Sequence, residues 1–188
     1  MKKYKFLILF TVLILLSSAG CDEKGHTGAA NKLTPKNNKV EVIKGDFIYR
    51  LVSEKREYRE SEPVKIYAEL EYTGEKEEIK ISHGGSPFFF PISEKTRGVN
   101  IDYPMIQPLI YSTMVKGDPL RKEYAGSGSY SSEDDEDFIK FMKQIMNNDF
   151  PVGEYTVNGS ADFSVITSEN EEDMKLTGQI EFKVVPKK

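Results

Sequence analysis

Several segments of this 188-residue chain alternate apolar and more polar residues with a period of two. The alternation runs through residues 64–72 and 78–81, and again through 155–165 and 176–184 near the C-terminus. A period of two places one side of a segment in the core and the other in water, which is typical of antiparallel strands with one solvated face. The pattern therefore predicts a protein built mainly from β-sheet.

Further β-rich segments support this class. Residues 47–52, 87–92 and 109–115 are rich in aromatic and branched apolar side chains, and turn residues such as Gly45 and Pro119 bound them. Short strands at regular spacing, separated by turns, are typical of antiparallel β-sandwiches. We therefore predict a mainly-β sandwich in a single domain.

One segment follows helical spacing instead. Apolar residues recur from Phe138 to Met146 at intervals of three and four, and five acidic residues at 133–137 suit the positive end of a helix dipole. Ser132 is a suitable N-cap. The sequence predicts one amphipathic helix over residues 133–146, inserted among the strands.

The stretch Phe-Pro-Val-Gly-Glu-Tyr-Thr-Val at 150–157 is followed by Ala161 and Phe163. It resembles the late-strand pattern of immunoglobulin-like domains in bacterial surface proteins, where a Pro/Gly turn leads into a Tyr-x-Val strand. With the earlier strand pair, the chain resembles small lipoproteins of Bacillus-type bacteria and, more loosely, the BsuPI-type (intracellular proteinase inhibitor) domain. The resemblance implies an immunoglobulin-like β-sandwich over residues 45–188, from which the long 96–136 region departs.

The N-terminus carries three lysines before residue 6, an apolar run at 6–16, small residues at 17–20 and then Cys21, the one cysteine of the chain. This arrangement resembles a bacterial lipoprotein signal peptide, although Ser18 stands where such signals usually carry Leu, Val or Ile. The resemblance implies cleavage after residue 20 and a membrane anchor made of diacylglyceryl and acyl chains on Cys21. An ordinary secretory signal would leave an exposed free thiol in an oxidising compartment, and a permanent membrane helix needs about 20 apolar residues.

Residues 21–44 are polar and contain Gly, Pro and Asn with little apolar periodicity. We interpret them as the lipidated cysteine and a flexible tether, with a span of roughly 25–30 Å. The chain then divides into a signal peptide (1–20), a tether (21–44) and a domain (45–188) held at the outer, extracytoplasmic face of the cell membrane.

Charge and chemistry exclude several functions. The 26 basic and 30 acidic residues are interspersed, which leaves no basic stripe for nucleic acid. His26 falls in the tether, and His83 lies in a Ser-His-Gly-Gly-Ser turn that lacks the G-x-S-x-G elbow of the esterases with His-Gly-Gly turns. The acidic run at 133–137 lacks EF-hand spacing. We expect no catalytic, metal or cofactor site.

An aromatic cluster is the candidate contact surface, formed by Phe88, Phe89, Phe90, Tyr103 and Met105 within the segments 84–92 and 103–110. Three consecutive aromatic residues cannot all face one side of a strand. They either form an exposed surface for a protein partner, or Phe88 and Phe90 fill the core with Phe89 beneath the helix.

These observations favour a non-enzymatic, lipid-anchored extracytoplasmic protein that binds a partner or assists one. The first alternative, which comes from the resemblance, is a protease-inhibitor-like module at the cell surface with a rigid, exposed, extended loop. The second is a small hydrolase, which would need a cleft that brings a hydroxyl and a carboxylate to His83.

Overall fold

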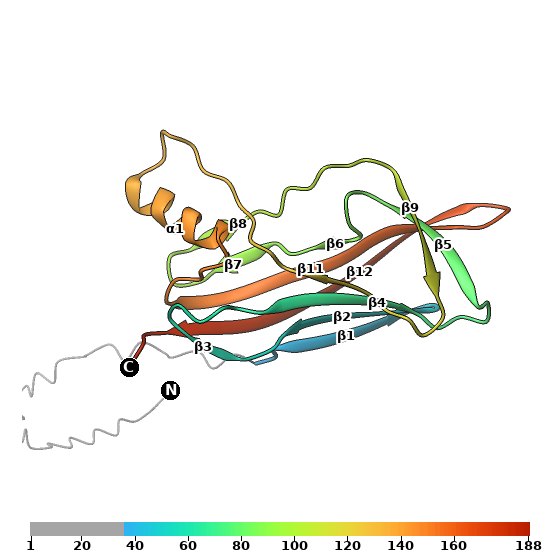
Figure 1. Ribbon diagram of the computed structural model, residues 1–188, viewed down its shortest axis with the longest axis horizontal. Coiled ribbons are helices and arrows are strands. Elements are labelled where there is room, and N and C mark those ends of the chain that lie inside the picture. The colour runs from blue at the N-terminus through green and yellow to red at the C-terminus, as the bar shows by residue number, and fades with distance from the viewer. Residues whose placement is uncertain (1–35) are drawn as a thin grey trace, which may run out of the picture. The chain divides into compact units, whose positions relative to one another are not determined.

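A computed structural model describes residues 36–188, which form twelve strands and one helix (Figure 1). In chain order the elements are β1 (Lys39–Lys44), β2 (Phe47–Ser53), β3 (Glu57–Arg59), β4 (Ile66–Tyr72), β5 (Glu78–His83), β6 (Phe88–Phe89), β7 (Ile92–Glu94), β8 (Val99–Ile101), β9 (Ile110–Val115), β10 (Leu120–Glu123), α1 (Glu136–Met146), β11 (Gly153–Ile166) and β12 (Glu171–Val185).

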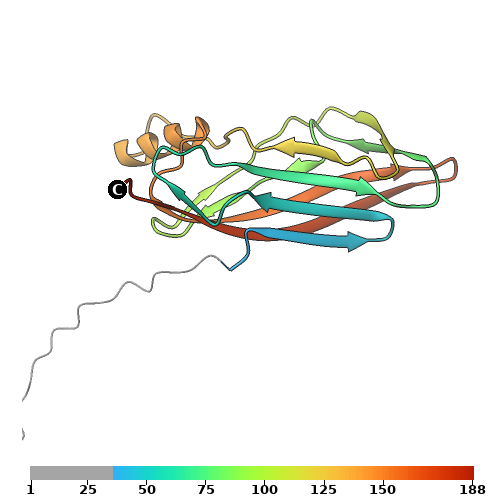
Figure 2. The same ribbon diagram turned by 60° about the horizontal axis from the view of Figure 1, so that its bottom comes forward.

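The strands form two sheets. The four-stranded sheet has the order β1-β2-β4-β10, and Figure 2 shows it in front of the second sheet. The eight-stranded sheet has the order β3-β12-β11-β5-β9, with β6 and β7 also pairing with β11, and β8 pairing with β7. All these pairs are antiparallel except the short β3–β12 pair. The predicted mainly-β class with a single helix is confirmed for the described part of the chain.

The long β11–β12 hairpin is the centre of the larger sheet. Its register runs without interruption from Gly153 opposite Val184 to Ile166 opposite Glu171. The inward side of each strand is apolar, as the alternation predicted, and the outward side is polar. The hairpin reaches beyond the predicted segments, to Gly153 and Ile166 on β11 and to Glu171 and Val185 on β12.

The two sheets meet closely at the paired glycines Gly159 and Gly178. A Cβ on Gly159 would lie 2.6 Å from Tyr49 Oη and 2.8 Å from a methyl carbon of Leu51, both on β2 of the facing sheet. Only residues without a side chain leave room for the Tyr49 ring here. The glycines therefore set how closely β2 approaches the hairpin.

Tyr49→Phe is expected to stabilise the protein. Tyr49 is fully buried, and its Oη has no hydrogen-bond partner among residues 36–188. Removing a buried unpaired hydroxyl should raise the free energy of unfolding by about 1 kcal/mol, which urea titration can measure. Tyr155→Phe is the control, since Tyr155 Oη donates to the Pro151 carbonyl at 2.6 Å and its loss should destabilise. Equal losses of stability in both variants would contradict the prediction.

The helix begins three residues later than predicted. Its N-cap is Asp135, because the Asp135 Oδ1 atom accepts a hydrogen bond from Phe138 N at 2.8 Å, so the prediction of Ser132 was wrong. The helix lies at one end of the molecule near β7 and β8 (Figure 1). Its buried Phe141 ring lies under the guanidinium of Arg97, 5.1 Å from ring centroid to Cζ.

Two other expectations need correction. Residues 39–44 were assigned to the tether, but they form β1, whose six residues all pair with β2. The reason is that Lys-Val-Glu-Val-Ile-Lys also alternates, and Val40 and Val42 are half-buried against the core. The single strand expected at 87–92 is divided into β6 and β7 at Pro91, which has no N–H to give to a ladder.

Candidate functional site

Residues 103–115 contain no charged side chain, in a chain that is 30% charged. They run from an irregular segment into β9, and we call them the apolar edge. Ile106 is 78% exposed, Leu109 67%, Tyr111 52% and Val115 50%. With Ile110, these make five of the eight exposed large hydrophobic residues found in residues 36–188. A cluster of this kind is typical of a contact surface, whereas a single exposed apolar side chain is not.

The irregular part of the apolar edge is held against the Gly84-Gly85 turn. Gly85 N donates to the Ile106 carbonyl at 3.0 Å, and Ser86 N donates to Met105 Sδ at 3.1 Å. A Cβ on Gly85 would lie 3.2 Å from the Ile106 carbonyl, so the glycine permits this close approach. The segment is thus exposed and extended, but fixed to the sheet at its middle.

Tyr103 fixes the beginning of the same segment. Its ring packs edge-on against Phe90 at 5.4 Å and Phe89 at 6.4 Å between centroids. Partial burial raises the pKa of Tyr103 above its usual value, so the phenol stays neutral at physiological pH. At the other end, Lys80 Nζ lies 4.4 Å from the centroid of the Tyr111 ring.

The structure separates the five predicted contact residues into two groups. Phe88 and Phe90 are each 1% exposed, so their assignment to a contact surface was wrong. They point between the sheets, where Phe88 stacks on Tyr49 at 6.4 Å. Phe89, Tyr103 and Met105 are half-buried at the border of the apolar edge. The ring contact of Phe89 is with Tyr103, on the irregular segment.

Two exposed residues of β9, Tyr111 and Val115, were not among the predicted contact residues. Their strand was read as an ordinary part of the sheet because its composition suits a buried strand. The long uncharged run at 103–115 is the signal that could have found them. Edge strands in soluble proteins usually carry a lysine or proline, and β9 carries neither.

His83 ends β5 and is held by two hydrogen bonds. Its Nδ1 lies 2.7 Å from the Gly84 carbonyl and its Nε2 lies 2.9 Å from Ser112 Oγ. A carbonyl only accepts, so Nδ1 carries the proton, and in the neutral ring Nε2 accepts from the serine. A hydroxyl is therefore in reach, but no carboxylate bonds to this histidine in the described chain. The absence of enzyme activity stays a prediction.

A hollow of about 500 Å³ borders the apolar edge at Leu109. Its polar side chains bond to one another: Ser82 Oγ donates to Glu171 at 3.0 Å, Ser164 Oγ donates to Asp173 at 2.7 Å, and Lys175 pairs with Asp162 at 2.9 Å. Such pairs are ordinary on the solvated face of a sheet. We assign the hollow no ligand.

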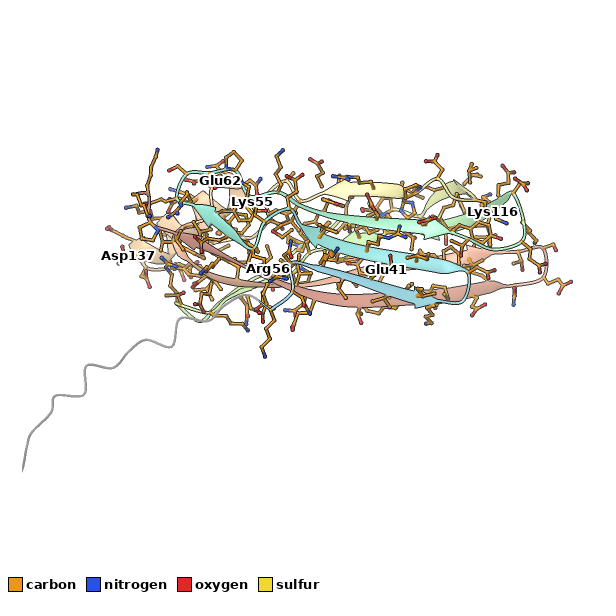
Figure 3. The ribbon with its side chains drawn as sticks, turned by 90° about the horizontal axis from the view of Figure 1, so that it is seen from below. Glu41, Lys55, Arg56, Glu62, Lys116 and Asp137 are labelled. Atoms are coloured by element: carbon orange, nitrogen blue, oxygen red, sulfur yellow. The ribbon has the colours of Figure 1, made fainter. Side chains whose placement is uncertain are left out.

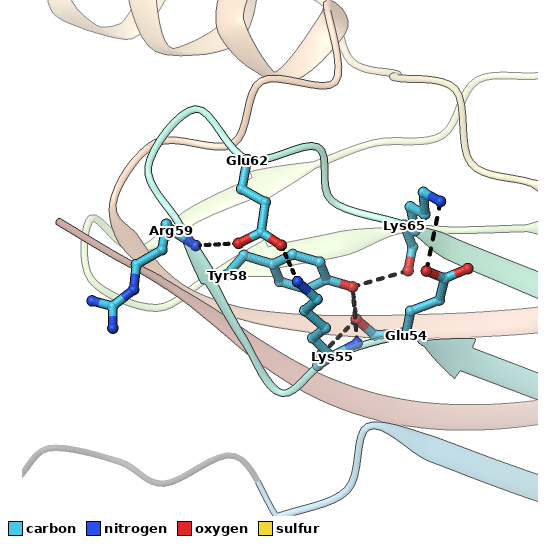
Figure 4. Close-up of polar contacts among 7 residues, drawn as sticks. Glu54, Lys55, Tyr58, Arg59, Glu62 and Lys65 are labelled. Carbon is cyan, nitrogen blue, oxygen red and sulfur yellow. Dashed lines mark hydrogen bonds and ion pairs between the residues drawn. The ribbon is translucent and has the colours of Figure 1, made fainter. Parts of the chain in front are cut away.

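A cluster of polar contacts surrounds Tyr58 on β3, in the chain connection that leads from β2 to β4 (Figure 4). Tyr58 Oη accepts from Lys55 N at 3.1 Å, donates to the Lys65 carbonyl at 3.1 Å and lies 2.9 Å from Ser53 Oγ. At the surface above it, Lys55 pairs with Glu62. These contacts join Ser53, Lys55 and Lys65 to one hydroxyl, so the cluster fixes the 53–65 connection.

Outside the apolar edge, charged side chains are distributed over the described domain, from Glu41 on β1 to Asp137 on the helix (Figure 3). On the four-stranded sheet they form pairs of opposite sign, such as Arg50 with Glu41 at 2.7 Å and Arg121 with Glu69 at 3.1 Å. The expectation that nucleic acid is not a partner stays a prediction.

Within residues 36–188, no group of three or more His, Cys, Asp or Glu side chains could hold a metal ion. No helix in the same part of the chain is both long and apolar enough to cross a bilayer. Cys21 and His26, together with the predicted signal peptide and most of the predicted tether, lie outside the described residues.

No protein-family model matches the chain, and no curated protein matches it significantly. Among solved structures, it distantly resembles a protein from Archaeoglobus fulgidus whose description gives no function. The sequences are 10% identical, the TM-score is 0.33, and the alignment covers 79% of this chain and 94% of the archaeal chain. This similarity assigns no family.

Proposed function

We propose that the protein is a non-enzymatic, lipid-anchored binding protein at the outer face of the cell membrane. In this proposal Cys21 carries the anchor and the apolar edge binds a protein partner. The observation that carries the binding role is the cluster of exposed apolar side chains from Ile106 to Val115. The anchor rests on the N-terminal sequence, in which the cysteine follows the apolar run and its small residues.

We also propose that the two sheets form an immunoglobulin-like sandwich. In such domains a tyrosine near the start of a late strand donates its hydroxyl to the backbone a few residues upstream. Here Tyr155, at the start of β11, donates to the carbonyl of Pro151 at 2.6 Å. Both residues belong to the 150–157 stretch that carries the sequence resemblance.

The anchor predicts that Cys21→Ala releases the protein from membranes. Each buried acyl methylene contributes about 0.8 kcal/mol, so two or three chains hold a protein almost permanently and their loss removes that energy. Ultracentrifugation should move the variant to the soluble fraction, and mass spectrometry should find acylated Cys21 only in the parent. Ser17→Ala, which exchanges one small residue for another, is the control. An intact leader or an unmodified thiol in the parent would contradict the anchor.

The binding role is tested by recovering partners from detergent-solubilised membranes with the full-length protein. Ile106→Ser combined with Leu109→Ser should reduce the recovered partner at least several-fold. Ile43→Ser is the matched control, because Ile43 is 66% exposed and lies on β1 of the other sheet. Equal recovery with all three proteins would show that the apolar edge does not bind.

A second candidate function is inhibition of an extracellular protease. The favouring observation is that residues 102–109 form an irregular segment that is exposed except at the half-buried Tyr103 and Met105, and that Met105 and Ile106 fix it to the Gly-Gly turn. Secreted proteases assayed with the protein should then be slowed, and replacement of Met105 or Ile106 should restore their rates. Unchanged protease rates would remove this candidate.

A further inference from the structure

We propose that the partner of the apolar edge is a second copy of this chain, which pairs its β9 antiparallel to β9 and joins two sheets into one. This inference rests on the proposed function, since it names the partner of the same surface. Three observations support it: the free backbone edge of β9, the absence of charged residues in β9, and the position of β1 on one side of the molecule.

The first step is that β9 has a free edge. It pairs with β5 on one side and forms the end of the eight-stranded sheet. Lys116 N donates to the Glu77 carbonyl at 2.9 Å, and antiparallel ladders alternate, so the N–H and C=O groups of Tyr111 and Thr113 point away from β5. In the described chain no strand accepts them. Such a row of groups pairs best with another extended strand.

The second step concerns the kind of strand that fits. Neither β9 nor the preceding residues 103–109 carry a charge. Both faces of the Ile110–Thr113 part of the strand are open to solvent. A partner strand with several charges would bury them against these apolar side chains, where Lys80 beside Tyr111 can balance only an acidic group, and burying unbalanced charges is costly. A second β9 brings no charge, and it presents Leu109, Tyr111 and Val115 to the same residues of its partner.

The third step is symmetry. Antiparallel pairing of two identical strands around Tyr111–Thr113 generates a two-fold axis perpendicular to the sheet. Such an axis keeps the four-stranded sheet of both copies on one side, so both copies present β1 to that side (Figure 1). Two copies that are anchored in the same membrane must both turn the side that carries β1 toward that membrane, and this pairing allows it. Confinement to a surface also raises their effective concentration, so a short strand pair suffices.

The contact near the end of β9 limits the pairing region. Gly117 N donates to the Tyr72 carbonyl at 2.9 Å, and Lys116 forms a bridge with Tyr72 on β4. The four-stranded sheet thus approaches the C-terminal end of the strand. The free part is Ile110–Met114, and the two-fold axis falls within it.

Thr113→Lys tests the pairing in the full-length, detergent-solubilised protein. Thr113 is exposed and its backbone faces away from β5, so a lysine keeps the fold but brings two like charges together across the axis. Thr177→Lys is the matched control, since Thr177 is an exposed threonine on β12 inside the same sheet. Light scattering across a concentration series should show dimers for the parent and Thr177→Lys, with dissociation at least tenfold easier for Thr113→Lys.

Cysteine cross-linking in intact membranes tests the same contact without relying on a charge. Single cysteines at Tyr111, Ser112 and Thr113 should give disulfide-linked dimers at one or more of these positions, and Thr177→Cys should give none. Cross-linking of the parent itself would reveal a free Cys21 thiol and so a failure of the anchor, not of the pairing.

Three results would overturn the inference. The first is a parent that stays monomeric at every concentration, with no cross-link at 111–113. The second is cross-linking at these positions to a different protein, which would keep the proposed binding role but name another partner. The third is a dimer that survives Thr113→Lys unchanged and gives no cross-link at 111–113, because the two copies would then associate through another surface.

Discussion

The protein is expected to unfold in mild alkali, beginning near pH 10, because three buried tyrosines must lose their phenolic protons. Tyr49, Tyr124 and Tyr155 are each at most 4% exposed. Burial raises the pKa of all three, and for Tyr155 and Tyr49 the nearby carboxylates of Glu94 and Asp162 raise it further. The native state therefore keeps protons that the unfolded chain releases at its ordinary tyrosine pKa of about 10.

The direction and size follow from proton linkage. Below about pH 10 both states are protonated and the full stability is present. Above it the unfolded state binds fewer protons, so the free energy of unfolding falls as pH rises, until the raised native pKa values are reached. Three groups give a slope of roughly 4 kcal/mol per pH unit. A typical stability of about 5–15 kcal/mol is then lost within about one to four pH units.

Urea titrations at a series of pH values from 8 to 12 measure this slope, with tyrosinate absorbance as a second signal. Tyr49→Phe is the internal control, because it removes one of the three phenols and should make the slope about one third smaller. A free energy of unfolding that stays constant from pH 10 to 12, or a slope that is the same in Tyr49→Phe as in the parent, would contradict the expectation.

The parts of the fold that the sequence predicts are those whose burial is periodic. The β11–β12 hairpin and β4 bury mainly alternate residues, and their alternation is readable without any knowledge of the partner strand. The short strands β3, β8 and β10 carry three or four residues each. Segments of three or four residues are too short to show a period of two. They are strands because a neighbouring strand provides the partners of their backbone hydrogen bonds.

Only part of the candidate site could be predicted from the sequence, again because the pairing of the strands is not visible in it. Composition located residues 103–110 as a possible surface, but it could not separate Phe88 and Phe90, which fill the core, from Phe89 beside them. The division follows the period of two along the chain, since Phe88 and Phe90 are buried and Phe89 between them is half-buried. The free edge of β9 could not be predicted either, because the position of a strand in its sheet depends on pairings that a single strand does not encode.

Tyr58→Ala is expected to cost about 3–5 kcal/mol of stability, the usual range for removing a buried aromatic side chain. Tyr58 is 1% exposed and packs edge-on against Phe182 at 5.8 Å. Its loss would leave a cavity beneath β3 and would remove the hydroxyl to which Lys55 N donates and from which the Lys65 carbonyl accepts. Thermal and urea unfolding of the full-length protein measure the loss.

Tyr58→Phe separates the hydroxyl from the ring. It keeps the packing against Phe182 and should cost about 1–3 kcal/mol, because the Lys55 N–H then loses its partner and the Lys65 carbonyl keeps its bond from Glu54 N at 3.0 Å but loses the one from the tyrosine. Lys55→Ala is the control. It removes the exposed ion pair with Glu62 but keeps the backbone N–H of residue 55, and should change stability little. If Lys55→Ala were as harmful as Tyr58→Phe, the surface ion pair, and not the buried hydroxyl, would fix the connection between β2 and β4.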